Sequence, residues 1–169
     1  MAEFEGLLAL SRQKIKQADH MLTVTYPLLK EPKLLLSSLD NIFLSVSLAM
    51  NAVLQFERSR KKIPVFGDSF ANQLSIFATR VAPEHSISKN YVKFISHLKE
   101  FVDHHKKSSV EFKRNDAYVM ADDDYDMKSL SAEVLKEQLA FAKMFISEMN
   151  LLLIHEQEKE MEPAKKVHP

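Results

Sequence analysis

The chain has 169 residues and a composition typical of a single globular domain, with 46% hydrophobic residues and 23 basic residues balanced by 23 acidic ones. Only 2 residues are glycine and none is cysteine, which excludes Gly-rich phosphate loops, disulfides, thiolate zinc sites and cysteine nucleophiles. The balanced charge does not call for a nucleic-acid or membrane partner. We therefore expect a cytoplasmic protein without a cofactor and without membrane association.

The N-terminal segment predicts an amphipathic helix from about Ala2 to Tyr26, because apolar residues recur in it at helical spacing. Pro27 is expected to break or end this helix, since a proline ring clashes with the preceding turn. The acidic start without a long apolar run is not typical of a signal peptide.

The segment from Leu34 to Phe56 is apolar on nearly all sides, which is typical of the central helix of a bundle. Polar residues such as Asp40 and Asn41 interrupt it too often for a membrane span. Ala49 and Ala52 lie three residues apart in this helix. Small residues at that spacing predict close contact with a neighbouring helix.

Three further helices are predicted downstream. The first runs from Ser69 to Arg80, is capped by Asp68 or Ser69, and is ended by Pro83. The next runs from Ser88 to Lys106, and the last from Ala132 to about Glu158, with Ser131 as its N-cap.

Between the last two helices, Val110–Lys113 and Ala117–Met120 are rich in strand-forming residues and flank a turn at Asn115 and Asp116. The segment predicts a short β-hairpin, with a helix end or an irregular loop as the alternative. The fold class is then all-α: one bundle of four to five helices over residues 1–156, a short hairpin near 110–120, and a charged, frayed tail at 157–169.

Two groups of polar residues suggest binding chemistry. Arg58, Arg60, Lys61 and Lys62 follow the central helix, where they either contact phosphates, as in an RNA-binding surface, or simply solvate the negative end of the helix dipole. His97, Glu100 and His104 share one side of a helix, as metal ligands do, but a solvated polar face is the simpler interpretation.

The acidic loop from Asp122 to Asp126 lacks the glycine and the terminal glutamate of a calcium-binding loop. We therefore predict no metal site.

The segment from Phe112 to Leu153 resembles the closing part of a HEPN domain, a small helical fold. The positions that carry the resemblance are Arg114-Asn115, Asp124-Tyr125 in the acidic loop, and Ala142 with Phe145. The run from Ala18 to Leu36 is also similar to uncharacterised archaeal helical proteins. The resemblance implies a bundle that works as a homodimer, and it adds Arg114 to the candidate RNA-contacting residues.

HEPN ribonucleases carry an arginine followed after four to six residues by a histidine. No histidine follows Arg114 at that distance, and the one formal match in the chain is Arg80 with His85. His85 is expected near solvent, because it follows Pro83 in a polar loop. Three hypotheses stay open: a non-catalytic module that binds a protein, nucleotide or RNA; a metal-independent ribonuclease using Arg80 and His85; and a structural subunit of a larger complex.

Overall fold

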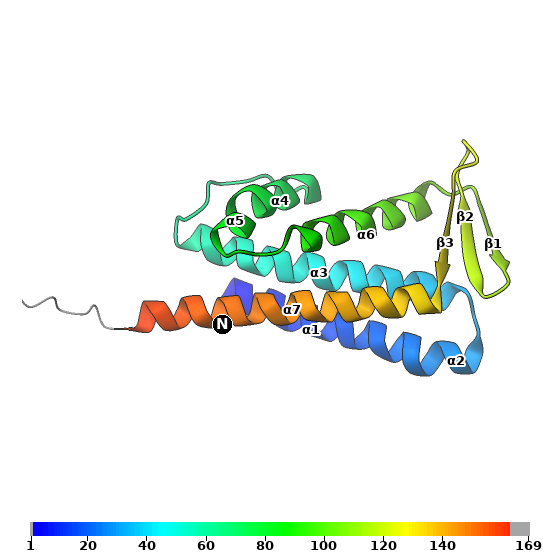
Figure 1. The fold of residues 1–169 in the computed structure, drawn as a ribbon, viewed down its shortest axis with the longest axis horizontal. Coiled ribbons are helices and arrows are strands. Elements are labelled where there is room, and N and C mark those ends of the chain that lie inside the picture. Colours follow the sequence, from blue (N-terminus) through cyan, green and yellow to red (C-terminus); the bar gives the residue numbers. More distant parts are fainter. Residues whose placement is uncertain (1, 163–169) are drawn as a thin grey trace, which may run out of the picture.

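The computed structural model describes residues 2–162 and shows an elongated helical bundle with a small sheet at one end (Figure 1). About 73% of the chain is helical, so the predicted helical bundle is confirmed. The description all-α is only partly right, because a three-stranded antiparallel sheet closes the end of the bundle where α2 lies (Figure 1).

The first helical segment runs beyond the predicted end at Tyr26. It consists of α1 (Glu3–His20), a π-helical turn η1 (Met21–Thr25) and α2 (Tyr26–Leu29). The backbone N–H of Tyr26 donates to the carbonyl of Met21, which makes the turn before Pro27 one residue wider than an α-helical turn. The wider turn accommodates the proline ring, so Pro27 does not end the helix. Lys30, with a positive φ of 52°, ends it instead.

The central helix α3 (Lys33–Ser59) lies in the middle of the bundle, as predicted, and packs along α1 and α7. Ile42, Ala49 and Ala52 are fully buried in it, whereas Ser37 at its start is exposed. Among the described helices, α3 is the one with the length and hydropathy of a membrane span. Half of the 18-residue stretch that has this hydropathy is buried inside the bundle. Membrane association and localisation stay predictions.

The third helical segment repeats the behaviour of the first. It consists of α4 (Phe70–Ile76), a second π-helical turn η2 (Phe77–Val81) and α5 (Ala82–Glu84). Ser69 caps it, as predicted, by accepting a hydrogen bond from the N–H of Asn72. The helix passes through Pro83, because Ala82 donates to the carbonyl of Phe77 across the wider turn. The prediction that Pro83 ends the helix is therefore wrong.

The predicted hairpin is confirmed, and it belongs to a larger sheet. Strands β1 (Val110–Arg114) and β2 (Ala117–Ala121) pair antiparallel around a turn at Asn115, whose φ is 56°. A third strand, β3 (Met127–Ser131), pairs with β2 and was not predicted. The sheet follows α6 (Lys89–Lys107) and leads directly into α7.

The last helix, α7 (Ala132–Met161), returns along the whole bundle beside α1 and α3 (Figure 1). Ser131 caps it by accepting a hydrogen bond from the N–H of Val134. Leu130 and Leu135, on either side of this cap, are both fully buried. The helix covers the first part of the predicted tail at 157–169, and residues 163–169 lie outside the described residues.

Candidate functional site

A sharp corner between α5 and α6, at the end of the bundle opposite the sheet, separates two surface pockets. The corner forms because Ser86 adopts a left-handed φ of 54° and the N–H of Ile87 donates to the carbonyl of Ala82 at 2.9 Å. Ser88 then caps α6 by accepting a hydrogen bond from Asn90. His85 is the residue that the corner presents to the bundle.

His85 binds a buried carboxylate of the central helix. Its Nε2 lies 2.7 Å from Oε1 of Glu57, whose side chain has 0% exposure, while the His85 side chain itself is 12% exposed. The expectation that His85 lies near solvent is therefore wrong. The second carboxylate oxygen of Glu57, Oε2, is buried and has no hydrogen-bond partner among residues 2–162. Such an oxygen carries a desolvation cost that no contact offsets.

A second carboxylate, Glu156 of α7, lies on the other side of the imidazole. Its Oε1 is 3.8 Å from Nδ1 of His85 and accepts a hydrogen bond from Lys159 at 3.2 Å, whereas its Oε2 accepts one from Lys62 at 3.1 Å. Burial would raise the pKa of Glu156, but these two ammonium groups outweigh it and lower the pKa below its ordinary value. The network ties the ends of α3 and α7 to the corner.

One pocket, of about 320 Å³, opens on the α7 side of the corner, and both polar and apolar residues line it. Its lining includes His85, Glu148, His155 and Glu156. Glu148 accepts a hydrogen bond from the hydroxyl of Tyr91 at 2.7 Å. Burial and this carboxylate raise the pKa of Tyr91 to about 12, so the phenol stays protonated. Among the described residues, two carboxylates and no lysine or arginine line this pocket, so it offers no permanent cation to a phosphate group.

The other pocket, a groove of about 480 Å³ between α5 and the start of α6, is apolar. Two lysines, Lys89 and Lys93, lie one helical turn apart at its rim, and Ser86 is the remaining polar lining residue. The other lining residues are aliphatic: Ala78, Ala82, Pro83, Ile87 and Val92. An apolar groove with two cations at its edge suits a ligand that joins apolar and acidic groups.

The structure places the two predicted catalytic residues in different surroundings. Arg80 is exposed on η2 and lines neither pocket beside the corner, whereas His85 is turned inward onto Glu57. Among the described residues, Arg80 makes no side-chain hydrogen bond or ion pair. To act on one phosphate, an arginine and a histidine must converge on one groove. Arg80 and His85 do not converge in this way within the chain.

The predicted phosphate-binding residues lie at opposite ends of the bundle. Arg60 makes two hydrogen bonds to Glu160, at 2.6 and 2.9 Å, and its guanidinium lies 4.1 Å from the Phe56 ring centroid. Arg58 lies over Phe66, and Lys62 binds Glu156.

Lys61, whose backbone is left-handed, ends α3 beside Arg60 and Lys62. Arg114 belongs to β1, and the sheet lies at the far end of the bundle (Figure 1). The five residues do not form one basic surface, because the protein's own carboxylates neutralise part of the run.

The histidines of α6 are also separated. His97 and Glu100 are exposed and lie 3.9 Å apart, whereas His104 is buried and contacts the carbonyl of Met120 at 3.0 Å. His104 instead approaches Asp122 and Asp126, with ligand atoms within 4.8 Å of one another. Oδ1 of Asp122 accepts hydrogen bonds from Asp124 and Asp126, which explains the shape of this loop without a bound ion.

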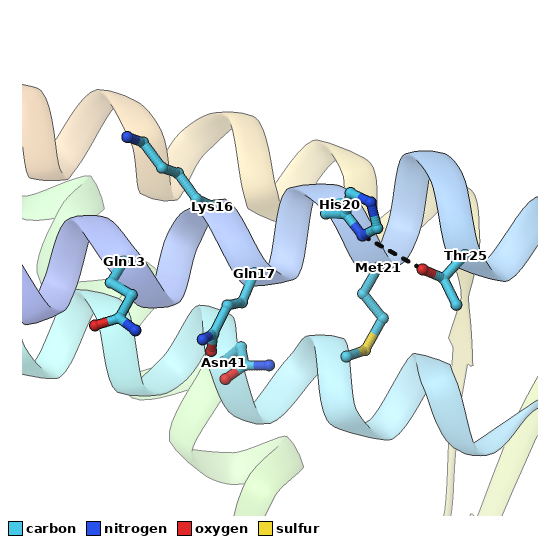
Figure 2. Close-up of a pocket in the computed structure, with 7 residues that line it drawn as sticks. All are labelled: Gln13, Lys16, Gln17, His20, Met21, Thr25 and Asn41. Atoms are coloured by element: carbon cyan, nitrogen blue, oxygen red, sulfur yellow. Dashed lines mark hydrogen bonds between the residues drawn. The ribbon is translucent and has the colours of Figure 1, made fainter.

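A third pocket, of about 430 Å³, lies between α1 and α3 (Figure 2). His20 and Thr25 contact each other across η1, with 3.4 Å between Nδ1 and Oγ1. The amide side chains of Gln17 and Asn41 also line this pocket (Figure 2). None of the lining residues is buried, so this pocket is an open surface hollow rather than an enclosed site.

Sequence reasoning missed Glu57 and Glu156, although a signal for both was present. Glu57 follows Met50, Val53 and Leu54 at helical spacing, and Glu156 follows Met149 and Leu153 in the same way. Each glutamate therefore occupies a position of the apolar stripe, where a charge is expected to be buried and paired. Their shared partner His85 could not be identified, because it comes from a distant segment.

Searches against protein-family models, curated proteins and solved structures found no match to this chain. The resemblance to HEPN domains and to archaeal helical proteins therefore stays a prediction.

Proposed function

We propose that this chain is a non-catalytic helical binding module that takes up an acidic, partly apolar peptide segment of a partner protein in the groove between α5 and α6. The observation that carries the proposal is the combination of an aliphatic groove with Lys89 and Lys93 at its rim. Aliphatic lining rewards the burial of an apolar side chain, and the two ammonium groups pair with carboxylates beside it. We also propose that the likeness to HEPN domains is one of fold, with a homodimer as the expected assembly.

The lining of the same groove favours a protein partner over a nucleotide or RNA. Bases bind mainly by stacking on aromatic rings, and the groove is lined by aliphatic residues and lysines. On the other side of the corner, the described pocket lining contains no lysine or arginine to pair with a phosphate backbone. Arg80 and His85 do not converge within one chain, so a ribonuclease is the less supported hypothesis. It is the alternative outcome of the test.

The test measures binding of fluorescent peptides in which leucines alternate with glutamates, against matched peptides with lysines in place of the glutamates. We expect the acidic peptide alone to bind, more weakly as salt is raised. Lys89→Glu with Lys93→Glu should abolish binding, and Val92→Asp should weaken it. Lys113→Glu with Lys136→Glu, which reverses two exposed lysines elsewhere, is the matched control.

Equal binding of both peptides, or an equal loss in the control variant, would refute a lysine-rimmed peptide site. The same protein is assayed for RNA cleavage and for oligomeric state by light scattering. Cleavage that His85→Gln removes would establish the ribonuclease alternative instead. A monomer would refute the expected homodimer.

A further inference from the structure

Three side chains near the corner bring cation ligands together. The ligand atoms of Glu57, Glu84 and His85 all lie within 4.8 Å of one another. Glu57 comes from the last turns of α3, Glu84 ends α5, and His85 follows it directly. One imidazole and two carboxylates, in a chain without cysteine, form a donor set that suits Zn²⁺ and chemically similar divalent ions.

The buried carboxylate oxygen of Glu57 is an independent observation that points to a ligand. Oε2 has no hydrogen-bond partner among residues 2–162, although the side chain has 0% exposure. The pKa of Lys62 is raised mainly by its hydrogen bond to Glu156, against the opposing effect of burial. The nearby charges of Glu57, Glu156 and Glu84 raise this pKa further. Its ammonium group is hydrogen-bonded to Glu156, so Oε2 of Glu57 keeps its desolvation cost.

The contact between Glu57 and His85 has nearly the spacing that a shared metal ion requires. Oε1 and Nε2 are 2.7 Å apart and share a proton. Two ligands of a tetrahedral zinc ion, each about 2.0–2.1 Å from the metal, lie about 3.3 Å apart. An outward movement of roughly half an ångström would therefore replace the shared proton by the ion.

Glu156 is placed to orient the imidazole. Metal-bound histidines usually donate their second ring N–H to a carboxylate, and Nδ1 of His85 faces Oε1 of Glu156 at 3.8 Å. Lys62 and Lys159 fix this carboxylate through hydrogen bonds. A small rotation of the imidazole would complete the hydrogen bond.

We propose that Glu57, Glu84 and Nε2 of His85 bind one Zn²⁺ or similar divalent ion, with Glu156 as a positioning residue that orients His85. The ion replaces the proton of the hydrogen bond between Glu57 and His85 and is coordinated by Oε2 or Oε1 of the buried carboxylate. Water occupies the fourth coordination position. The site joins α3 to the corner, so the ion also stabilises the fold by mass action. This inference goes beyond the peptide-binding function and does not depend on it.

The experiment is calorimetric titration of the metal-free protein with zinc chloride, in two buffers that differ in ionisation enthalpy. We expect one Zn²⁺ per chain, release of about one proton per ion, and a higher melting temperature with zinc. Glu84→Gln should weaken binding by more than about 10-fold. Glu84 is exposed, so this variant should fold like the wild type. Glu156→Gln should weaken binding by about 10–100-fold.

Two matched measurements separate this site from other zinc ligands of the chain. Asp122→Asn removes a ligand from the second cluster, with His104 and Asp126, and should leave zinc binding unchanged. Cobalt chloride should give the visible absorption of a tetrahedral ion in the wild type, and Glu84→Gln should diminish it. The proposal is overturned by a wild type that takes up no zinc, by unchanged binding in Glu84→Gln, or by lost binding in Asp122→Asn. Peptide binding by Glu84→Gln keeps the two proposals distinguishable.

Discussion

Nε2 of His85 lies 2.7 Å from Oε1 of Glu57, and this contact joins the corner between α5 and α6 to the buried end of α3. Glu57 has 0% side-chain exposure, so its buried carboxyl group depends on the imidazole for a hydrogen bond. The pair is therefore part of the structure's stability as well as of its candidate metal site.

His85→Ala should lower the free energy of unfolding by about 3 kcal/mol, because it leaves a buried carboxylate without a partner. His85→Gln, which keeps a hydrogen-bond donor, should lose clearly less. Urea denaturation of metal-free protein measures both. A loss within about 0.5 kcal/mol for His85→Ala would be typical of a surface residue and would contradict the buried contact.

Acid should loosen the end of α7 through Glu156. Its pKa is lowered in the folded protein, since hydrogen bonds from Lys62 and Lys159 outweigh burial. The stabilisation is therefore fully present above the ordinary carboxyl pKa and is lost as pH falls through the lower folded value. Melting temperatures between about pH 6 and pH 3 should show this loss, and Glu156→Gln should reduce the pH dependence.

Glu160 provides the comparison for that measurement. Its hydrogen bond from Arg60 lowers its pKa in the same direction, but the side chain is 43% exposed. Solvent screens such a pair, so Glu160→Gln should change the pH dependence much less than Glu156→Gln. An equal effect of the two variants would mean that Glu156 is as solvated as Glu160.

The helices could be predicted from sequence because their apolar stripes are long and regular, and the caps at Ser69 and Ser131 mark two of their starts. The two prolines were misread for one physical reason. Pro27 and Pro83 each follow a π-helical turn, and a turn widened by one residue has no signature in hydrophobic spacing. Strand β3 was missed because Met127–Ser131 has no clear alternation of apolar and polar residues, so its pairing with β2 decides its structure.

The candidate site could be predicted only in fragments. Arg80 and His85 were selected by their spacing along the chain, but the fold separates their surroundings and gives His85 a carboxylate from α3. The decisive observation, an oxygen of Glu57 without a hydrogen-bond partner in the described part of the chain, exists only once helices from three parts of the chain are packed. No periodicity argument contains that information.

Ala49→Leu and Ala52→Leu should each destabilise the protein by roughly 1–3 kcal/mol, because both alanines are fully buried and the added side chain has no space to fill. Ser37→Leu is the matched control on the same helix, at an exposed position. Thermal melts of the three variants decide the matter. Melting temperatures equal to that of the wild type for both alanine variants would show that α3 is not the central helix.

Lys61 occupies a position that favours glycine. Its φ is 57°, and it ends α3 in a Schellman motif, in which Lys62 donates to the carbonyl of Glu57 at 3.0 Å and Lys61 to that of Arg58 at 2.9 Å. A side chain in this left-handed conformation costs roughly 1–2 kcal/mol, which glycine avoids.

Lys61→Gly should therefore raise the free energy of unfolding by about 1 kcal/mol, because the relief of strain exceeds the greater unfolded-state freedom of glycine. Lys16→Gly, at an exposed position inside α1, should instead lower it by about 1 kcal/mol. Urea denaturation of the two variants gives opposite signs if the motif is correct. A loss of stability in both would mean that Lys61 is not left-handed, and α3 would then have to end in another way, with Lys62 no longer held beside Glu156.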